Sequence, residues 1–436
     1  MTNHTTLLGE PLQLPNSLWA ATAIDAPVAV PLKDNVITDV LIVGAGFTGL
    51  SAAIHLAEEG KRVVVVDAAE PGWGASGRNN GQVIAGLKLD PEDIERAYPG
   101  QTGKKLLRLG SEAPSVVFDL IGRYGIDCAA TRAGWIQPAF TRSGIRAVEQ
   151  RCRSWGARGV ATRLLQGKEL AALLGTNHYS VGWLDPRGGG IQPLSYARGL
   201  AHAAQKLGAA IHCQTRITAL RKKTDGHWEA TTPFGTLHAQ QVIVATGAYA
   251  DKLVPGLRTS IVPVRTAQVA TKPLPTPMRQ HILPQGHVSS DTRQLLTSFR
   301  LSPDGRLVMG GSGATAGLKH SHIVPYLHRA GEQLFGHLGK LEWEYQWSGY
   351  FAVTMDHLPH VHEPDTGMYV SLGCNGRGIA VSTSLGVQLA KRALGATAES
   401  LDVPITSIGT VPFHAFRGIG VAVATRYKRL QDMLLQ

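Results

Sequence analysis

The clearest pattern of apolar and polar positions lies in residues 36–69. An apolar run, VITDVLIV, meets the glycine turn GAG, and apolar residues then recur every three or four positions from Leu50 to Ala57, as on one face of a helix. Gly60 ends this helix, and a second apolar run, VVVV, ends at Asp67. The pattern predicts a strand, a helix and a second strand, with the two strands parallel and buried.

The same succession of apolar strand, glycine turn and helix returns in MYVSLGCNGRGIAVSTSLG, and VIVATGAYA gives a further apolar strand. Amphipathic helices and a stretch of strands and turns lie between these parts. A chain of 436 residues exceeds what one hydrophobic core usually supports. We therefore predict an α/β protein with a Rossmann-like nucleotide-binding domain built from the discontinuous segments 36–90, 188–257 and 345–417, and a second, mixed-sheet domain built from 91–187 and 258–344. An N-terminal surface arm, 1–35, and a C-terminal helix, 418–436, complete the expected organisation.

Composition narrows the class of protein. The hydrophobic fraction is 43%, no apolar run is long enough to span a bilayer, and the opening residues MTNHTTLLGE lack the order of a signal peptide. We therefore expect a cytoplasmic protein. The four cysteines form no CxxC pair, and the histidines of DHLPHVH lack the spacing of a zinc site, so we expect no metal.

The net charge of +11 raises the question of an anionic partner. The basic residues are spread along the chain instead of forming long runs, so we expect no nucleic-acid partner. The C-terminal segment mixes apolar positions at helical spacing with Arg426 and Lys428. A helix docked on the body is the expected state, and peripheral contact with the inner membrane is the alternative.

The turn GAGFTG, residues 44–49, follows a strand and opens a helix, which is the context that gives the GxGxxG pattern its meaning. Gly44 permits the tight turn, Gly46 lets the backbone approach a pyrophosphate, and Gly49 lets helix and strand pack closely. The helix N-terminus favours the negative charge of the phosphates. The predicted contacts of this turn with a dinucleotide are Gly44, Gly46, Phe47, Thr48 and Gly49.

The next strand ends at Asp67, where a carboxylate accepts hydrogen bonds from a ribose diol and disfavours NADP. The loop PGWGASGRNNGQ follows directly, where a dinucleotide would continue towards its redox ring. Its glycines permit close approach and its polar side chains offer hydrogen-bond donors, which favours FAD over NAD; an NAD-dependent dehydrogenase and a plain surface loop are the alternatives. The predicted FAD contacts here are Asp67, Ala68, Gly74, Ala75, Ser76, Arg78, Asn79, Asn80, Gly81 and Gln82.

Longer segments of the chain resemble the D-amino-acid oxidase-like family of FAD-dependent amine oxidoreductases. They are DVLIVGAGFTGLSAAIHLAEEGKRVVVVDA, GWGASGRNNGQ, GGGIQPLSYARGLAHAAQKLGA, VIVATGAYA, FRLSPDGRLVMGG, WSGYFAVTMDHLPHV and LGCNGRGIAVSTSLG, in family order. The resemblance implies that a helix beginning at Gly378 points its positive end at flavin atoms that gain negative charge on reduction. It also implies FAD contacts from Arg216, Ile217, Thr246, Gly247, Trp347, Gly376, Arg377, Gly378 and Ile379.

Two departures from the family pattern bear on the ligands. The sarcosine-oxidase branch attaches FAD through a cysteine in the region matching WSGYFAVT, and this chain has none from Trp347 to Thr354, so we expect non-covalent FAD. That branch also binds its substrate carboxylate with an arginine and a lysine, at positions that match Ile84 and Ala380 here. A small α-amino acid held by that clamp is therefore not expected, and a longer amine or a differently bound imino acid is favoured.

The resemblance implies oxidation of a C–N bond, in which a hydride passes from the carbon next to the amine to flavin N5 and the imine is then hydrolysed. Arg377, Tyr350 and Trp73 are the residues expected in the active site. The first expected substrate is a gamma-glutamylated polyamine, with oxygen as electron acceptor. The alternative is a cyclic or N-alkyl amino acid such as L-pipecolate or proline, with electrons passed to a membrane acceptor. From another class, the flavin module of a tRNA-modifying enzyme stays open.

Overall fold

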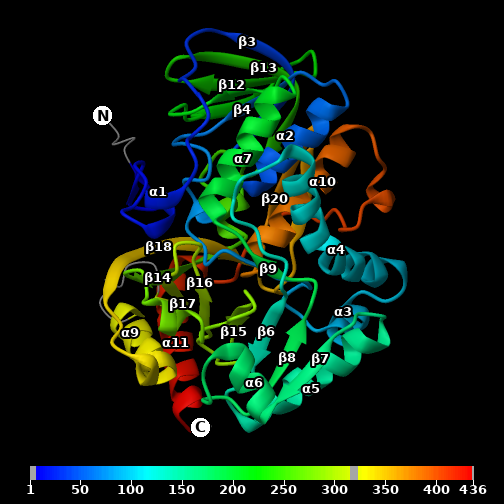
Figure 1. Ribbon diagram of the computed structural model, residues 1–436. Helices are drawn as coiled ribbons and strands as arrows, with labels where there is room; N and C mark the ends of the chain where they lie inside the picture. The colour runs from blue at the N-terminus through cyan, green and yellow to red at the C-terminus, as the bar shows by residue number, and fades with distance from the viewer. Residues whose placement is uncertain (1–5, 315–322, 435–436) are drawn as a thin grey trace.

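The computed structural model describes residues 6–314 and 323–434. Residues 1–5 of the expected arm, 315–322 of the expected second domain and 435–436 of the expected C-terminal helix lie outside the described residues. Figure 1 shows two sheet-based bodies, one above the other, with the helices α2, α7 and α10 on the upper one. No helix in the described parts is both long and apolar enough to cross a membrane.

The upper body is built on an eight-stranded sheet whose main path runs β10-β4-β3-β13-β12-β11, with β20 beside β13 and β19 beside β20. The strands β10, β4, β3, β13 and β20 pair in parallel, and β11, β12 and β19 pair antiparallel. This arrangement confirms the Rossmann-like α/β prediction. The bounds are β3 (Val36–Val43), β4 (Val63–Val66), β10 (Ala210–His212), β11 (Ala219–Lys222), β12 (Trp228–Thr232), β13 (Gly235–Val244), β19 (His360–Asp365) and β20 (Met368–Leu372).

Apolar side chains cover both faces of this sheet, which explains the continuous apolar runs of the sequence. Leu41 and Ile42 follow one another in β3, point to opposite faces and are both fully buried in two different clusters. The helices α2 and α10 pack against each other, and α7 packs on α2. Their bounds are α2 (Phe47–Glu58), α7 (Pro193–Lys206) and α10 (Gly378–Ala393).

The lower body is built on a second eight-stranded sheet, in the order β18-β14-β17-β16-β15-β6-β8-β7. Only β15 and β6 pair in parallel, so the sheet is mixed, as expected. Helices α5 (Arg142–Ala157), α6 (Gly167–Leu174) and α9 (Ile323–Phe335) pack on it. The strands are β6 (Trp135–Pro138), β7 (Arg163–Gln166), β8 (Val181–Asp185), β14 (Val262–Thr271), β15 (Val288–Ser290), β16 (Thr297–Leu301), β17 (Leu307–Ala314) and β18 (Trp343–Val353).

Two expected boundaries between the bodies are wrong. Strand β18 pairs with β14 from end to end, so residues 345–353 belong to the second sheet and not to the first. Helix α4 (Gln101–Tyr124) packs on α10 and α7, so the start of the segment 91–187 belongs with the first body. Sequence periodicity shows that a segment is a strand or a helix, but its partner depends on contacts far along the chain.

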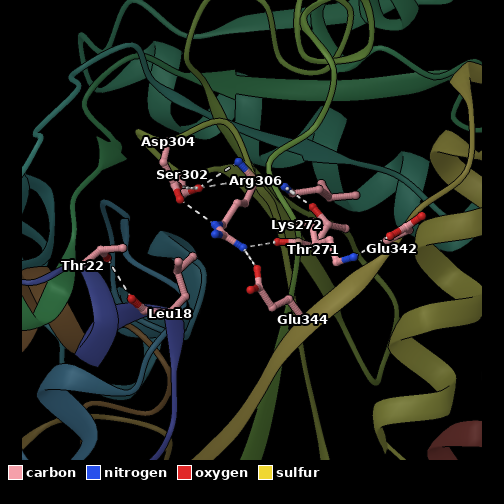
Figure 2. A network of polar contacts seen from close by, with 10 residues as sticks. Leu18, Thr22, Thr271, Lys272, Ser302, Asp304, Arg306, Glu342 and Glu344 are labelled. Atoms are coloured by element: carbon pink, nitrogen blue, oxygen red, sulfur yellow. Dashed lines mark hydrogen bonds and ion pairs between the residues drawn. The ribbon is translucent and has the colours of Figure 1, made fainter.

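A polar network fixes the outer end of the second sheet (Figure 2). The Arg306 guanidinium donates to the Asp304 carboxylate at 2.5 Å and to the Thr271 carbonyl at 3.0 Å, and it also pairs with Glu344. Beside it, Lys272 pairs with Glu342 at 2.8 Å. These contacts join β14, β18 and the turn between β16 and β17 at one end of the second sheet.

The N-terminal segment is packed into the molecule, which corrects the expectation of a surface arm. Leu18 and Trp19 are fully buried, and the Trp19 indole donates to the Asn79 carbonyl at 2.8 Å. The Trp73 indole donates to the carbonyls of Pro11 and Gln13. The segment therefore covers the loop 71–82. Its elements are β1 (Thr6–Leu7), β2 (Glu10–Pro11) and α1 (Leu18–Thr22).

The remaining elements are short or terminal. Strands β10 and β11 are separated by residues 213–218, which belong to neither strand. Helix α11 (Arg417–Leu434) is the expected C-terminal helix, and it contacts β17. The other bounds are α3 (Pro91–Ala97), α8 (Thr276–Arg279), β5 (Gln82–Val83) and β9 (Gly189–Gly190).

Candidate active site

An elongated pocket follows the carboxyl ends of β3, β4, β13 and β20. It encloses about 1170 Å³, counted out to its open mouth. In parallel sheets of this type, ligands bind at this edge of the strands. The lining comes from residues 43–48, 66–68, 72–76, 215–217, 245–249, 251, 253, 351–352, 371–374, 382 and 385.

The glycine turn forms the wall at the start of α2. Gly44 has a φ of +110°, and a Cβ added there would lie 2.7 Å from the Ala245 carbonyl oxygen. A Cβ added at Gly46 would lie 2.9 Å from Ser76 Oγ. Helix α2 has no acidic side chain in its first turn, so no like charge opposes an anion near its N-terminus. Gly49 is outside the lining, and its lack of a side chain lets α2 pack on the turn, as expected.

Asp67 stands at the end of β4 with its carboxylate fixed by the backbone. One oxygen accepts a hydrogen bond from Ala45 N at 2.7 Å, and the other accepts from Ala69 N at 2.8 Å. Burial raises the pKa of Asp67, and these two hydrogen bonds oppose that rise. Further along the pocket, Arg216 pairs with Asp251 at 3.0 Å. The predicted residues Ala68, Arg216, Ile217, Thr246 and Gly247 all line this part.

The loop 71–82 divides into a half that lines the pocket and a half that supports it. Trp73, Gly74, Ala75 and Ser76 line the pocket, and Ser76 Oγ accepts a hydrogen bond from Phe47 N at 3.0 Å. This contact joins the loop to the glycine turn. The sequence predicts that this loop continues the dinucleotide site, and its first half lines the same pocket as the glycine turn.

The second half of the loop turns away from the pocket. Arg78 is 2% exposed, and its guanidinium donates to the Trp73 carbonyl at 2.7 Å and the Ser348 carbonyl at 3.3 Å. Trp347 donates from its indole to the Arg78 carbonyl at 3.0 Å. The amides of this half bind protein groups within the loop and on the second sheet. None of the predicted contacts Arg78, Asn79, Asn80, Gly81, Gln82 and Trp347 lines the pocket.

The far end of the pocket lies between β18 and the turn that precedes α10. Phe351, Gly373 and Cys374 line it. The turn continues through the predicted residues Gly376, Arg377, Gly378 and Ile379, which are outside the lining. A Cβ added at Gly376 would lie 3.9 Å from the Phe351 ring, so this turn lies immediately behind the end of the pocket.

Arg377 is directed towards the second sheet. Its guanidinium carbon lies 4.9 Å from the centre of the Trp135 ring, on β6. Burial, together with the charge of Arg151, lowers the pKa of Arg377 to about 10. Arg377 therefore lies between the two bodies and next to the far end of the pocket.

The two aromatic residues predicted to be catalytic occupy different places. Trp73 lines the pocket, where its ring centre is 5.0 Å from that of Tyr249. Tyr350 does not line it, because its side chain points to the other face of β18, between Arg265 and Tyr249. Sequence reasoning missed Tyr249 and Cys374 as lining residues, although both lie inside segments that the family resemblance had marked.

The histidines of DHLPHVH have structural partners. His360 Nε2 lies 3.0 Å from both Asp356 carboxylate oxygens, and His362 Nδ1 lies 2.8 Å from the Thr406 carbonyl. Throughout residues 6–314 and 323–434, no three histidine, cysteine or acidic side chains are grouped so as to bind a metal ion.

A flavin dinucleotide requires a pocket with a glycine turn and helix N-terminus at one wall and a carboxylate at a strand end, and this pocket has both and reaches the turn before α10. The glycine turn and the pocket thus define the class of dinucleotide-binding flavoproteins. The chain belongs to the FAD dependent oxidoreductase family, which matches residues 39–392.

Two curated relatives extend over nearly the whole chain. The chain is 31% identical over 444 aligned residues to gamma-glutamylputrescine oxidoreductase of Escherichia coli (strain K12), with 100% of both chains covered. It is 29% identical to the probable oxidoreductase OrdL of Haemophilus influenzae, covering 92% of this chain and 94% of the relative. Among solved structures, glycine oxidase from Geobacillus kaustophilus has a TM-score of 0.71 at 23% identity, covering 86% of this chain and 100% of that one. The similarity to glycine oxidase supports the assignment of the fold alone.

The protein is therefore an FAD-dependent oxidoreductase, as the sequence predicted. Gly44, Gly46, Phe47, Thr48, Asp67 and Ser76, all predicted FAD contacts, line the pocket together. Phe351, Gly373 and Cys374 form the end that would receive the isoalloxazine ring. When bound, FAD supplies the acceptor for a hydride.

Proposed function

We propose that the protein oxidises the C–N bond of an amine, and that its substrate is a gamma-glutamylated polyamine of the kind named for the Escherichia coli relative. The observation that carries the proposal is the full-length similarity to that relative, together with a pocket that matches the requirements of FAD. An identity of 31% supports the reaction class more strongly than the particular amine.

In such a reaction, the residues of this chain would orient the amine and stabilise negative charge. Trp73 and Phe351 provide apolar surface at the cofactor pocket, which excludes water from the reacting carbon and nitrogen. A substrate bound with a neutral amine already carries the lone pair that the oxidation needs, so orientation is more important than a dedicated base. We assign Tyr350 a positioning role, since its backbone amide donates to the Tyr249 hydroxyl at 3.4 Å.

Arg377 and the N-terminus of α10 provide positive potential at the same end. Arg377 is the residue before α10, whose last turn carries Lys391 and Arg392 and whose first turn carries no acidic group. A helix oriented in this way places its positive end at the pocket, where it stabilises negative charge. We propose that Arg377 reinforces this potential, either towards the cofactor or towards an anionic part of the substrate.

The experiment is an anaerobic mixing of the FAD-loaded protein with each amine, followed by admission of air. Gamma-glutamylputrescine should bleach the flavin absorbance, and air should restore it with formation of peroxide. L-Pipecolate and L-proline are the comparison substrates. Bleaching by these two, and not by the glutamylated amine, would overturn the substrate assignment and keep the reaction class.

A membrane electron acceptor is the second candidate, and the outward face of α11 favours it. Ile419, Val423 and Tyr427 follow one another at helical spacing, and each is at least 60% exposed. Such a face, next to Arg426 and Lys428, suits the surface of an anionic bilayer. Turnover with an artificial dye but without peroxide, together with sedimentation on anionic vesicles, would favour this acceptor over oxygen.

A further inference from the structure

The N-terminal residues 10–32 touch the wall of the cofactor pocket at two places. The Trp73 indole, which lines the pocket, donates to two carbonyls of this segment at 3.0 and 3.1 Å. Near the other end of the segment, Leu32 N donates at 3.0 Å to the Thr215 hydroxyl, and Thr215 lines the pocket as well. We call residues 10–32 the strap. The residues that line the pocket all come from outside the strap, so its influence on a cofactor passes through the pocket wall.

Between these two places the strap follows helix α7. The Ile24 amide donates to the Ser195 hydroxyl at 3.1 Å, and the Ile24 carbonyl accepts from the Arg198 guanidinium at 2.7 Å. Further along, the Val28 carbonyl accepts from the Gln205 side-chain amide at 2.7 Å. The backbone of the strap is thus bonded to side chains along α7, which fixes its path between the two contacts with the pocket wall.

Glu10 joins the strap to the loop 71–82 by charge. One carboxylate oxygen pairs with Arg78 at 3.5 Å, and the other pairs with Arg265 on β14. The three side chains are at most 14% exposed, so solvent screens these pairs little. The Arg78 guanidinium carbon in turn lies 4.5 Å from the centre of the Trp73 ring, and Arg78 Nε donates to the Trp73 carbonyl at 2.7 Å. Glu10 therefore holds Trp73, a residue of the pocket wall, through Arg78.

Trp19 joins the strap to the second half of the same loop. It is fully buried, and its indole donates to the Asn79 carbonyl at 2.8 Å. Its ring lies edge-on to the Trp347 ring of β18, with 5.7 Å between the ring centres. The Trp347 indole donates to the Arg78 carbonyl at 3.0 Å. Two successive carbonyls of the loop are thus fixed by two tryptophans, one from the strap and one from the second sheet.

The strap has little regular structure of its own, since residues 10–32 contain only β2 and the five-residue helix α1. Its order therefore depends on the surfaces that it contacts, among them the loop 71–82 and Thr215. Four of its residues are prolines: Pro11, Pro15, Pro27 and Pro31. Proline restricts the undocked chain, which lowers the entropy that docking costs. Because the loop 71–82 and Thr215 also contribute to the pocket wall, the strap and a cofactor depend on the same residues.

We propose that the strap and FAD stabilise each other, with Glu10 and Trp19 as the positioning residues that keep the pocket wall in its binding conformation. A wall held by the strap needs less ordering when FAD binds, and a wall held by FAD presents an ordered surface to the strap. Such coupling is reciprocal, so the docked strap tightens FAD binding by the same factor by which FAD tightens docking of the strap. The coupling concerns the cofactor of the family and is independent of which amine the enzyme oxidises.

The first test uses the native chain without a variant. Hydrogen exchange is measured for the apoprotein and for the FAD-loaded protein. Peptides from the strap should exchange about tenfold more slowly with FAD bound, although the strap lies outside the pocket lining. Peptides from β7 and α6, residues 163–174 of the second body, report any change in global stability and should exchange alike in both forms. Equal exchange of the strap peptides in the two forms would overturn the coupling.

The second test removes the charge of Glu10. Glu10→Gln keeps the size of the side chain but leaves Arg78 without this carboxylate, so the hold on Trp73 weakens. The Kd for FAD should rise about tenfold, the effect of losing a hydrogen bond to a charged group. The control is Glu169→Gln on α6, which removes a carboxylate that also pairs with an arginine, Arg163, but lies outside the strap. The control variant should bind FAD with the native Kd.

A third test removes one hydrogen bond between the strap and the loop. Trp19→Phe keeps an aromatic ring in the buried position and loses the indole donor to the Asn79 carbonyl. The Kd for FAD should rise about fivefold, as for one neutral hydrogen bond, and the strap peptides of the FAD-loaded variant should exchange faster than those of the native protein. The control is Trp228→Phe, because Trp228 is also buried and its indole N–H has no hydrogen-bond partner among the described residues. This variant should bind FAD with the native Kd.

The outcomes separate a strap coupled to FAD from one that only stabilises the fold. If Glu10→Gln lowers the Tm of the apoprotein while the folded protein binds FAD with the native Kd, the role of Glu10 is structural and the coupling is overturned. Equal Kd values for Glu10→Gln and Glu169→Gln would overturn it too. If Glu10→Gln does not fold, the exchange of the native strap decides alone. Failure of every amine to bleach the flavin would contradict the proposed function and leave these results unchanged.

Discussion

The two ends of the candidate site are built in different ways. At the dinucleotide end, the glycine turn, Asp67 and Ser76 come from one stretch of about thirty residues, and backbone groups make most of the contacts. At the flavin end, Phe351, Arg377 and Trp135 come from three distant segments, and Arg377 reaches Trp135 only because the two sheets face each other. Cofactor binding is therefore a local property of this chain, and substrate selection is a property of its tertiary structure.

The largest expected effect comes from adding a side chain at the glycine turn, which would fill space at the dinucleotide end of the pocket. In Gly44→Ala, the new methyl group would lie 2.7 Å from the Ala245 carbonyl, and the φ of +110° disfavours any side chain. We expect the purified protein to be colourless and not to be reconstituted by added FAD. The control is Gly60→Ala, which also has a positive φ but no atom within 4 Å of the added Cβ. Equal FAD content in the two variants would contradict the role of the turn.

The next effect is at the flavin end and should spare the cofactor. Arg377→Met should retain FAD but lose about tenfold to a hundredfold in kcat/KM, the range for a lost hydrogen bond to a charged group. Arg146→Met, which removes an exposed arginine on α5, should have native kinetics. An Arg377→Met protein with native kcat/KM would show that substrate selection does not involve this residue.

A smaller effect is expected at the strand end. Asp67→Asn keeps the shape of the side chain. Its NH2 group, however, is a donor, and it would meet one of the two backbone N–H donors at Ala45 and Ala69. We expect the Kd for FAD to rise by about tenfold, with little change in the kcat of the fully loaded enzyme. The Kd is measured by titrating the apoprotein with FAD and monitoring the quenching of flavin fluorescence. An unchanged Kd would remove Asp67 from the cofactor site.

The smallest effect should come from Ser76→Ala. This variant loses one neutral hydrogen bond, to Phe47 N, that joins the loop 71–82 to the glycine turn. Such a bond contributes about 1 kcal/mol, so the Kd for FAD should rise by about fivefold. Because Ser76 lies at the dinucleotide end, the ratio of rates for carboxylated and uncarboxylated amines should not change. A changed ratio would show that the two ends are coupled.

Much of the dinucleotide end could be predicted from the sequence. Thirteen of the predicted FAD contacts line the pocket: Gly44, Gly46, Phe47, Thr48, Asp67, Ala68, Gly74, Ala75, Ser76, Arg216, Ile217, Thr246 and Gly247. These residues lie in or next to strand ends and turns whose conformation is set by nearby sequence. A glycine turn between a buried strand and a helix has few possible conformations, so its role follows from its pattern.

The rest could not be predicted because it depends on which segments meet. Arg78 and Asn79 have the chemistry of phosphate ligands, but buried carbonyl oxygens nearby accept their hydrogen bonds instead. Tyr350 and Phe351 differ only in the face of β18 to which they point, and β18 was assigned to the wrong sheet. Trp135 lies in no motif, and its contact with Arg377 arises only because the two sheets face each other.

Non-covalent FAD remains a prediction, and it depends on the absence of cysteine from residues 347–354. Cys374 lines the pocket, but burial raises the pKa of its thiol, which disfavours the reactive thiolate. Acid denaturation followed by ultrafiltration should release all of the flavin into the filtrate. Flavin retained with the precipitated chain, and lost in Cys374→Ser, would show a covalent bond at this residue.

The most direct test of the central claim, that this FAD enzyme oxidises a gamma-glutamylated polyamine, is anaerobic flavin bleaching by gamma-glutamylputrescine and by putrescine under identical conditions. We predict complete bleaching by the glutamylated amine and at least tenfold slower bleaching by putrescine. Bleaching by putrescine that is as fast or faster would contradict the account.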